Sequence, residues 1–110
     1  MDSYPVGPGW WPLLATHLPA IYASDKEISK VDIKEKYGTL RVDFVSGSEE
    51  AFRVADIILH QSEETCENCG GHRTPGGRQP WCARCREATP GEFRVIRNAT
   101  EQAYNRLKDF

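Results

Sequence analysis

Apolar residues in the first part of the chain recur at helical spacing. Between residues 10 and 21 they lie three or four positions apart or side by side: Trp10, Leu13, Leu14, Leu18 and Ile21. This is the pattern of a helix that buries one face, and it favours a core position for the tryptophans. Pro12 suits the first turn, where its missing N–H would have no partner anyway. Pro19 removes a hydrogen bond from the helix interior, so we expect a kink or a break near Leu18.

Residues 27–46 change to an alternation of apolar and polar positions, which predicts strands. Ile33 lies between charged neighbours, and Leu40 and Val42 alternate with polar residues. A turn at residues 37–39 would join the two runs into an antiparallel hairpin with one face in water. We assign the charged residues of this segment to the solvated face and not to catalysis.

Two further helices are predicted from the same kind of periodicity. Ser48 can cap the first of them, and its apolar stripe comprises Phe52, Ala55, Ile58 and Leu59. The stripe of the last helix comprises Phe93, Ile96, Ala99, Ala103 and Leu107. Basic residues on its other faces are interpreted as a solubilising surface, with contact to phosphates as the alternative: Arg94, Arg97, Arg106 and Lys108.

All four cysteines fall within the stretch CENCGGHRTPGGRQPWCARC. They form two C-x-x-C pairs separated by twelve residues, Cys66 with Cys69 and Cys82 with Cys85. Two such turns placed face to face supply four thiolates in a tetrahedron, which is the arrangement that a structural Zn²⁺ prefers. Gly70-Gly71 allows a sharp turn after the first pair. We therefore predict that these four cysteines are zinc ligands.

Other roles for the cysteines agree less well with the sequence. Residues 1–19 lack the charged start, apolar run and cleavage site of a secretory signal, so stable disulfides are not expected. A redox dithiol is typically a single C-x-x-C that opens a helix. His72 is an alternative ligand, although four thiolates already complete the shell.

The elements in order predict a small α+β fold, with an antiparallel β-hairpin packed on helices. We expect one domain over residues 1–110, in which a zinc-ribbon module at residues 64–88 precedes the C-terminal helix. The apolar fraction of 39% is adequate for a small core but below average, so the zinc should contribute to the folding free energy. No apolar run is long enough to cross a membrane.

No catalytic residue is predicted. A zinc ion closed by four thiolates has no open position for water or substrate. Nucleobase deaminases need a P-C-x-x-C turn and an H-x-E motif, but Trp81 precedes Cys82 and no histidine has Glu two residues later. HNH nucleases also carry two C-x-x-C turns, but their catalytic histidine follows an acidic residue, whereas His72 follows Gly71. We expect neither an enzyme nor a small-molecule substrate.

Charge is unevenly distributed along the chain, whose overall net charge is −2. Residues 1–65 carry 6 basic and 11 acidic residues, a net of −5, whereas residues 66–110 carry 8 and 5, a net of +3. Local fields govern binding more than the total does. The metal end therefore offers a candidate contact surface: His72, Arg73, Arg78, Trp81, Arg84 and Arg86.

Three segments together carry a resemblance to a known group of proteins. GWWPLL near the start, IKEKYGTLRV in the middle and CENCG at the first cysteine pair resemble small, mostly uncharacterised bacteriophage and prophage proteins. In those proteins K-E-K-[YF]-G-x-L-R precedes C-E-x-C-G. The resemblance spans roughly residues 9–85 and leaves residues 86–110 unmatched. It implies a cytoplasmic protein in an infected bacterial host, with no assigned activity.

Two hypotheses for function follow. The first is a non-enzymatic protein that binds a host protein, for example as an anti-CRISPR-like inhibitor of an antiviral defence complex. The small size, the absence of catalytic groups and the acidic first part favour it. The alternative is a nucleic-acid-binding zinc ribbon with a regulatory role, in which Trp81 stacks on a base and the surrounding arginines contact phosphates.

Overall fold

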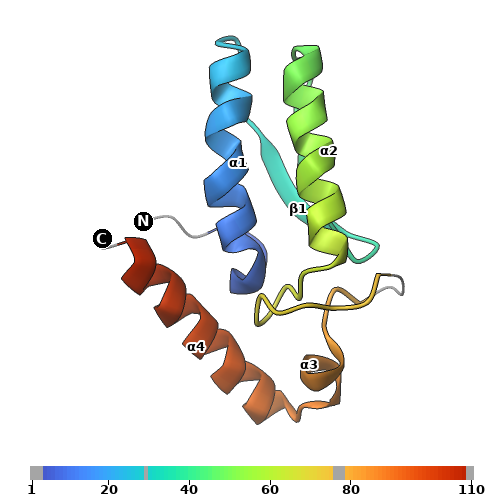
Figure 1. The fold of residues 1–110 in the computed structure, drawn as a ribbon, viewed down its shortest axis with the longest axis vertical. Helices are drawn as coiled ribbons and strands as arrows, with labels where there is room; N and C mark the ends of the chain where they lie inside the picture. Colours follow the sequence, from blue (N-terminus) through green and yellow to red (C-terminus); the bar gives the residue numbers. More distant parts are fainter. Residues whose placement is uncertain (1–3, 29, 76–78, 109–110) are drawn as a thin grey trace.

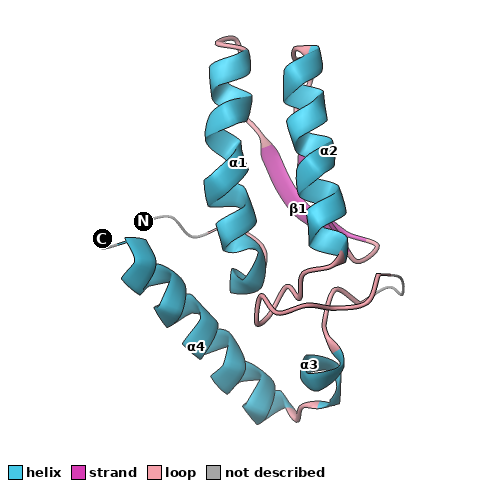
Figure 2. Ribbon diagram, viewed as in Figure 1, coloured by secondary structure: helices cyan, strands magenta, loops and turns pink. Residues whose placement is uncertain are grey.

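The computed structural model describes residues 4–28, 30–75 and 79–108 and has the predicted α+β fold. A 3₁₀ turn, η1, leads directly into the first helix. The elements in chain order are η1 (Pro8–Trp10), α1 (Trp11–Ser24), β1 (Asp32–Lys36), β2 (Thr39–Asp43), α2 (Glu49–Glu63), α3 (Ala83–Glu87) and α4 (Pro90–Lys108). Figures 1 and 2 show α1 and α2 side by side, the loops that follow α2 beyond one end of this pair, and α3 beyond the loops, from where α4 runs back toward the level of the start of α1.

The core lies between α1, α2 and the hairpin. Leu14 and Ile21 of α1, Leu40 of β2 and Ile58 of α2 are fully buried. Trp10 and Trp11 are also buried, with 0% and 4% of their surfaces exposed, so their predicted place in the core is confirmed. None of the helices in the described part of the chain is both long and apolar enough to cross a bilayer.

Helix α1 continues through Pro19, so of the predicted kink or break near Leu18 the break is wrong. Pro19 is exposed, and so is Ala15, whose carbonyl would otherwise accept the missing N–H. That carbonyl can therefore bond to water, which reduces the cost of the proline. On the opposite side, Leu18 and Ile21 are buried in the core and hold the helix in place.

Strands β1 and β2 form the predicted antiparallel hairpin, with Ile33 opposite Val42 and Lys36 opposite Thr39. Tyr37 and Gly38 connect them, and both have positive φ angles, 54° and 78°. Two such residues give the type I′ turn, whose twist matches that of paired strands. The register therefore places the apolar residues of the hairpin on the side that faces α2.

Helix α2 begins as predicted, and the face that it presents to the core is shifted from the predicted stripe, of which Ile58 is buried and Ala55 packs against the core. The hydroxyl of Ser48 accepts a hydrogen bond from the N–H of Ala51 at 3.1 Å, so the predicted cap is confirmed. The buried residues are Ala51, Val54, Ile58 and Ser62. Phe52 of the predicted stripe is 51% exposed and instead stacks against Phe44 after β2, with ring centroids 4.7 Å apart. The prediction of Phe52 as a core residue is therefore wrong.

Helix α4 meets the rest of the protein mainly at η1 and the start of α1. Tyr104 is buried and packs its ring edge-to-face against Trp11, with centroids 5.5 Å apart. Ala99 and Ala103 are exposed, and Leu107 is 72% exposed. The sequence pattern therefore predicted the helix correctly but not its packed side, because α4 contacts a small part of the body and not a continuous core.

Candidate metal centre

The first cysteine pair lies in a tight loop directly after α2. The carbonyl of Cys66 accepts a hydrogen bond from the N–H of Gly70 at 2.8 Å, and the N–H of Cys66 donates to the carbonyl of Gly71 at 2.7 Å. Gly70 has a φ angle of 76°, in the left-handed region that favours glycine. The N–H of Gly71 points at the sulfur of Cys69 at 3.3 Å. The glycine pair thus folds the main chain around the sulfurs, as the sequence indicated.

The second pair is held by α3, an element that sequence analysis did not predict. Cys82 is the N-cap residue of α3 and Cys85 lies within it. The N–H of Arg86 donates to the carbonyl of Cys82 at 3.0 Å. One helical turn therefore brings both sulfurs of this pair to the same side.

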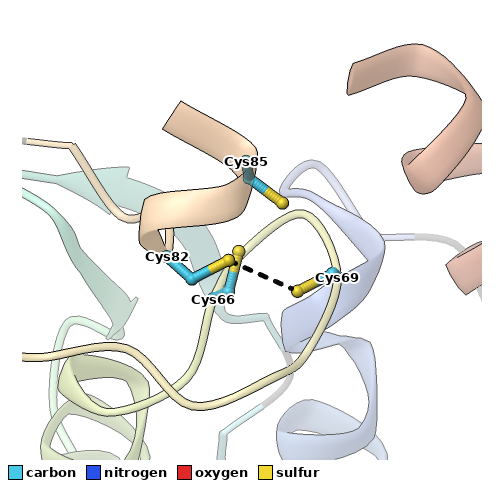
Figure 3. Close-up of side chains that lie close together, drawn as sticks. All are labelled: Cys66, Cys69, Cys82 and Cys85. Carbon is cyan, nitrogen blue, oxygen red and sulfur yellow. Dashed lines mark hydrogen bonds between the residues drawn. The ribbon is translucent and has the colours of Figure 1, made fainter. Parts of the chain in front are cut away.

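The four sulfur atoms form one cluster. All lie within 4.8 Å of one another, and those of Cys69 and Cys82 are 3.7 Å apart (Figure 3). A regular tetrahedron with Zn–S distances of about 2.3 Å has S–S edges of about 3.8 Å. The cysteines are free thiols and not disulfides. Together, Cys66, Cys69, Cys82 and Cys85 can hold a metal ion, and His72 is not part of the cluster.

The cluster is partly shielded from water. Cys66 and Cys85 are 0% and 2% exposed, while Cys69 and Cys82 are half-buried. Burial raises the pKa of Cys85 to about 12 and also raises the pKa of Cys69. At Cys82 burial acts in the same sense, but hydrogen bonds from Cys85 and the neighbouring thiols outweigh it and lower the pKa to about 7. A bound cation would stabilise all four thiolates, so metal binding must release protons.

Asn68 connects the cluster to α4. Its side-chain nitrogen donates to the sulfur of Cys85 at 3.5 Å and to the carbonyl of Phe93 at 3.2 Å, and the residue is only 2% exposed. Such contacts around a metal site fix the position of its ligands. Sequence analysis missed Asn68 because the only available signal was its place between two cysteines.

Glu67 connects the same loop to the N-terminal segment. Its carboxylate accepts a hydrogen bond from the N–H of Gly7 at 2.9 Å, and its main-chain carbonyl accepts one from the N–H of Gly9 at 2.7 Å. Burial raises the pKa of Glu67, although the bonds from Gly7 and the Trp81 side chain oppose that shift. At Gly9 a Cβ atom would lie 2.1 Å from the carbonyl oxygen of Cys66. Only glycine therefore permits this close approach.

Arg73 is a buried structural residue and not part of a contact surface, so this part of the sequence prediction is wrong. It is 4% exposed, and its guanidinium donates to four carbonyls, those of Gly38, Ser62, Thr65 and Gln79. These carbonyls belong to the hairpin turn, to the end of α2 and to both sides of the loop between α2 and α3 (residues 64–82), which we call the metal loop. Burial lowers the pKa of Arg73, while the negative charge of Cys66 acts in the opposite direction.

Of the other predicted contact residues, Trp81 and Arg86 line one cleft and Arg84 lines another. His72 is exposed and pairs with Thr65 in an isolated bridge. Arg84 and Arg86 are exposed on α3 but line different clefts, and Trp81 is half-buried against Phe93. Arg78 lies outside the described residues.

Neither protein-family models, nor curated proteins, nor solved structures give a match to this chain. The function must therefore be argued from the site and from the surfaces around it.

Proposed function

We propose that the four cysteines bind one structural Zn²⁺ ion and that the protein is not an enzyme. Four soft thiolate donors at tetrahedral spacing favour zinc over cations that prefer oxygen ligands. A shell completed by four protein ligands leaves no position at which the ion could activate water. In this account the metal joins η1, α2 and α4 through the loops around it.

We infer that the protein acts by binding another protein, and the outer face of α4 carries this inference. Val95 is 69% exposed and Leu107 is 72% exposed, and the exposed Ala99 and Ala103 lie between them at steps of four residues. We call these four residues the α4 stripe. Apolar helix faces of this kind are typical of sites where one helix packs into a groove of a partner. The small side chains of Ala99 and Ala103 at the centre of the α4 stripe would let a partner approach the helix closely.

The finer proposal follows from the resemblance to phage proteins. The partner would be a protein of an infected bacterial cell, contacted in its cytoplasm, and the consequence would be inhibition of an antiviral defence complex. The acidic first part of the chain, with a net charge of −5, would help to select a partner with a basic surface.

Affinity capture from a bacterial host lysate tests this proposal when it is combined with matched variants. Val95→Asp places a charge in the α4 stripe, whereas Val45→Asp makes the same change at a fully exposed valine after β2. We expect a saturable partner that wild type and Val45→Asp retain and that Val95→Asp loses by at least about tenfold, because a buried unpaired charge is costly at an interface. Equal capture by both variants, or no saturable partner, would refute the role of the α4 stripe.

A further inference from the structure

A cleft beside the metal centre combines positive charge with aromatic rings. It has a volume of about 380 Å³ and lies between α3 and the first half of α4, which Figure 1 shows next to each other. Trp81 and Phe93 form its apolar wall, and Arg86, Arg94 and Arg97 also line it. We call it the arginine cleft.

The three guanidinium groups are available for a ligand. All three arginines are exposed, and within the described residues neither Arg86 nor Arg94 forms an ion pair or a hydrogen bond through its side chain. The charge of Arg97 acts to lower the pKa of Glu67, which lines the neighbouring cleft but not this one. No carboxylate is among the residues that line the arginine cleft. This arrangement favours an anion.

The cleft on the opposite side of α3 is a useful contrast. It is lined by Arg84 together with Glu87 and Glu92, so the two carboxylates outweigh the one guanidinium. Of these two clefts, only the arginine cleft has a positive lining, so only it is suited to a polyanion.

The negative charge of the metal centre opposes the positive field of the three arginines but does not cancel it. Four thiolates around a divalent cation carry a formal charge of −2, and Cys85 lies in the wall of the arginine cleft. The buried Arg73 offsets part of that charge from within, since it experiences the charge of Cys66 directly. The three arginines of the cleft are exposed, so an approaching anion meets them first.

The aromatic wall adds a second kind of contact. The rings of Trp81 and Phe93 meet edge-to-face, with centroids 4.9 Å apart and an interplanar angle of 68°. A second hollow of about 440 Å³ shares Trp81, Phe93 and Arg97 with the arginine cleft and adds Tyr4. Two hollows thus adjoin the aromatic pair, which would suit successive bases of one strand.

We propose that the arginine cleft binds single-stranded nucleic acid, with Arg86, Arg94 and Arg97 at phosphates and Trp81 and Phe93 against bases. A single strand uses both features of the cleft, whereas an acidic peptide would use the arginines and leave the rings without a role. This site is separate from the α4 stripe and does not depend on the proposed protein partner.

Fluorescence anisotropy with labelled twelve-nucleotide single strands of DNA and RNA, added to the zinc-loaded full chain, tests the proposal. We expect binding at low salt that weakens as salt rises. The double variant Arg94→Gln/Arg97→Gln should bind about tenfold more weakly and lower the slope of log K against log salt by about 1.4. The control Arg53→Gln/Arg106→Gln removes the same charge at exposed positions outside the cleft and should change affinity less than about twofold.

Tryptophan emission gives a readout that does not rely on charge. Trp10 and Trp11 are buried in the core, so a change on adding an unlabelled strand reports Trp81, and Trp81→Phe should abolish that change. Absence of binding at tens of micromolar in low salt would overturn the proposal. An equal loss of affinity in the two double variants would overturn it as well. Displacement of the strand by an equal concentration of polyglutamate would also overturn it, because that result would assign the cleft to acidic peptides.

Discussion

Replacement of Arg73 by methionine removes the contacts that join the hairpin, α2 and the metal loop. The guanidinium donates to the carbonyl of Ser62 at 3.0 Å, to that of Thr65 at 3.2 Å and to that of Gln79 at 3.4 Å, and also to that of Gly38. Methionine fills a similar volume but donates no hydrogen bond. The variant therefore isolates the contribution of the donors from that of packing.

The loss of stability can be assessed from the acceptors that remain. Ser62 keeps a bond from the N–H of Thr65, and Thr65 keeps one from the indole of Trp10, each independent of the arginine. The carbonyl of Gly38 lies on a buried residue and loses the guanidinium. An unsatisfied buried acceptor costs about 1–3 kcal/mol, and each hydrogen bond from a charged donor contributes a comparable amount. We therefore expect Arg73→Met to lower the free energy of unfolding by about 3–5 kcal/mol.

Urea unfolding of the zinc-loaded protein, followed by circular dichroism, measures this loss. Arg73→Lys keeps the charge but replaces the fork by one ammonium group, so it should lose about half as much. It also keeps the test valid if the methionine variant does not fold. The control Arg53→Met removes an exposed arginine whose partner is Glu50 and should cost less than about 0.5 kcal/mol. A loss of under about 1 kcal/mol in Arg73→Met would refute the reasoning.

The remaining predictions concern one close backbone contact and one titrating group. Gly9→Ala should lower the unfolding free energy by about 3 kcal/mol, because its Cβ would overlap a main-chain carbonyl of the first cysteine turn; Gly91→Ala, whose Cβ meets nothing within 4 Å, should be neutral or stabilising. A hydrogen bond from the imidazole of His60 to the carboxylate of Glu63, together with the charge of Asp56, raises the pKa of His60. The stabilising effect of this residue is therefore present below about pH 6.5 and is lost as pH rises through the raised pKa. NMR titration should therefore give His60 a lower pKa in Glu63→Gln than in wild type, and equal values would contradict the assigned cause.

The features that could be predicted from sequence are those whose determinants are local. The hairpin follows from alternation on both sides of a turn, and the α2 cap follows from Ser48 three residues before its donor Ala51. The sulfur cluster follows from two C-x-x-C turns, because each pair brings its own sulfurs together. No knowledge of the rest of the fold is needed for any of these.

The features that were missed depend on contacts between distant segments. Arg73 looked like one more surface arginine, since its acceptors are main-chain carbonyls, one of them 35 residues away, and any residue type can supply a carbonyl. The choice between Phe52 and its neighbour Ala51 as the buried position depends on where α1 and the hairpin lie. Pro19 was expected to kink or break α1, and the helix does not break there, because the effect of a proline depends on whether the carbonyl that it leaves unpaired can reach water.

The metal loop is where the separate parts of this small protein meet. The indole of Trp10 donates to the carbonyl of Thr65 at 2.8 Å, Gly9 bonds to Glu67, and Asn68 bonds to the first turn of α4. The core lies largely on the other side of this loop, between α1, α2 and the hairpin. Removal of the metal should therefore release η1 and α4 first and weaken the remaining body through the loss of the contacts made by Arg73.

The most direct test of the account is the metal content and ligand set of the purified protein. Native mass spectrometry should give one zinc ion per chain, and X-ray absorption should show four sulfur ligands at about 2.3 Å. Replacing either cysteine of a pair by serine should remove the ion or introduce an oxygen ligand. A zinc ion with nitrogen or oxygen ligands in the wild-type protein, or a folded protein that binds no metal, would contradict the four-thiolate centre.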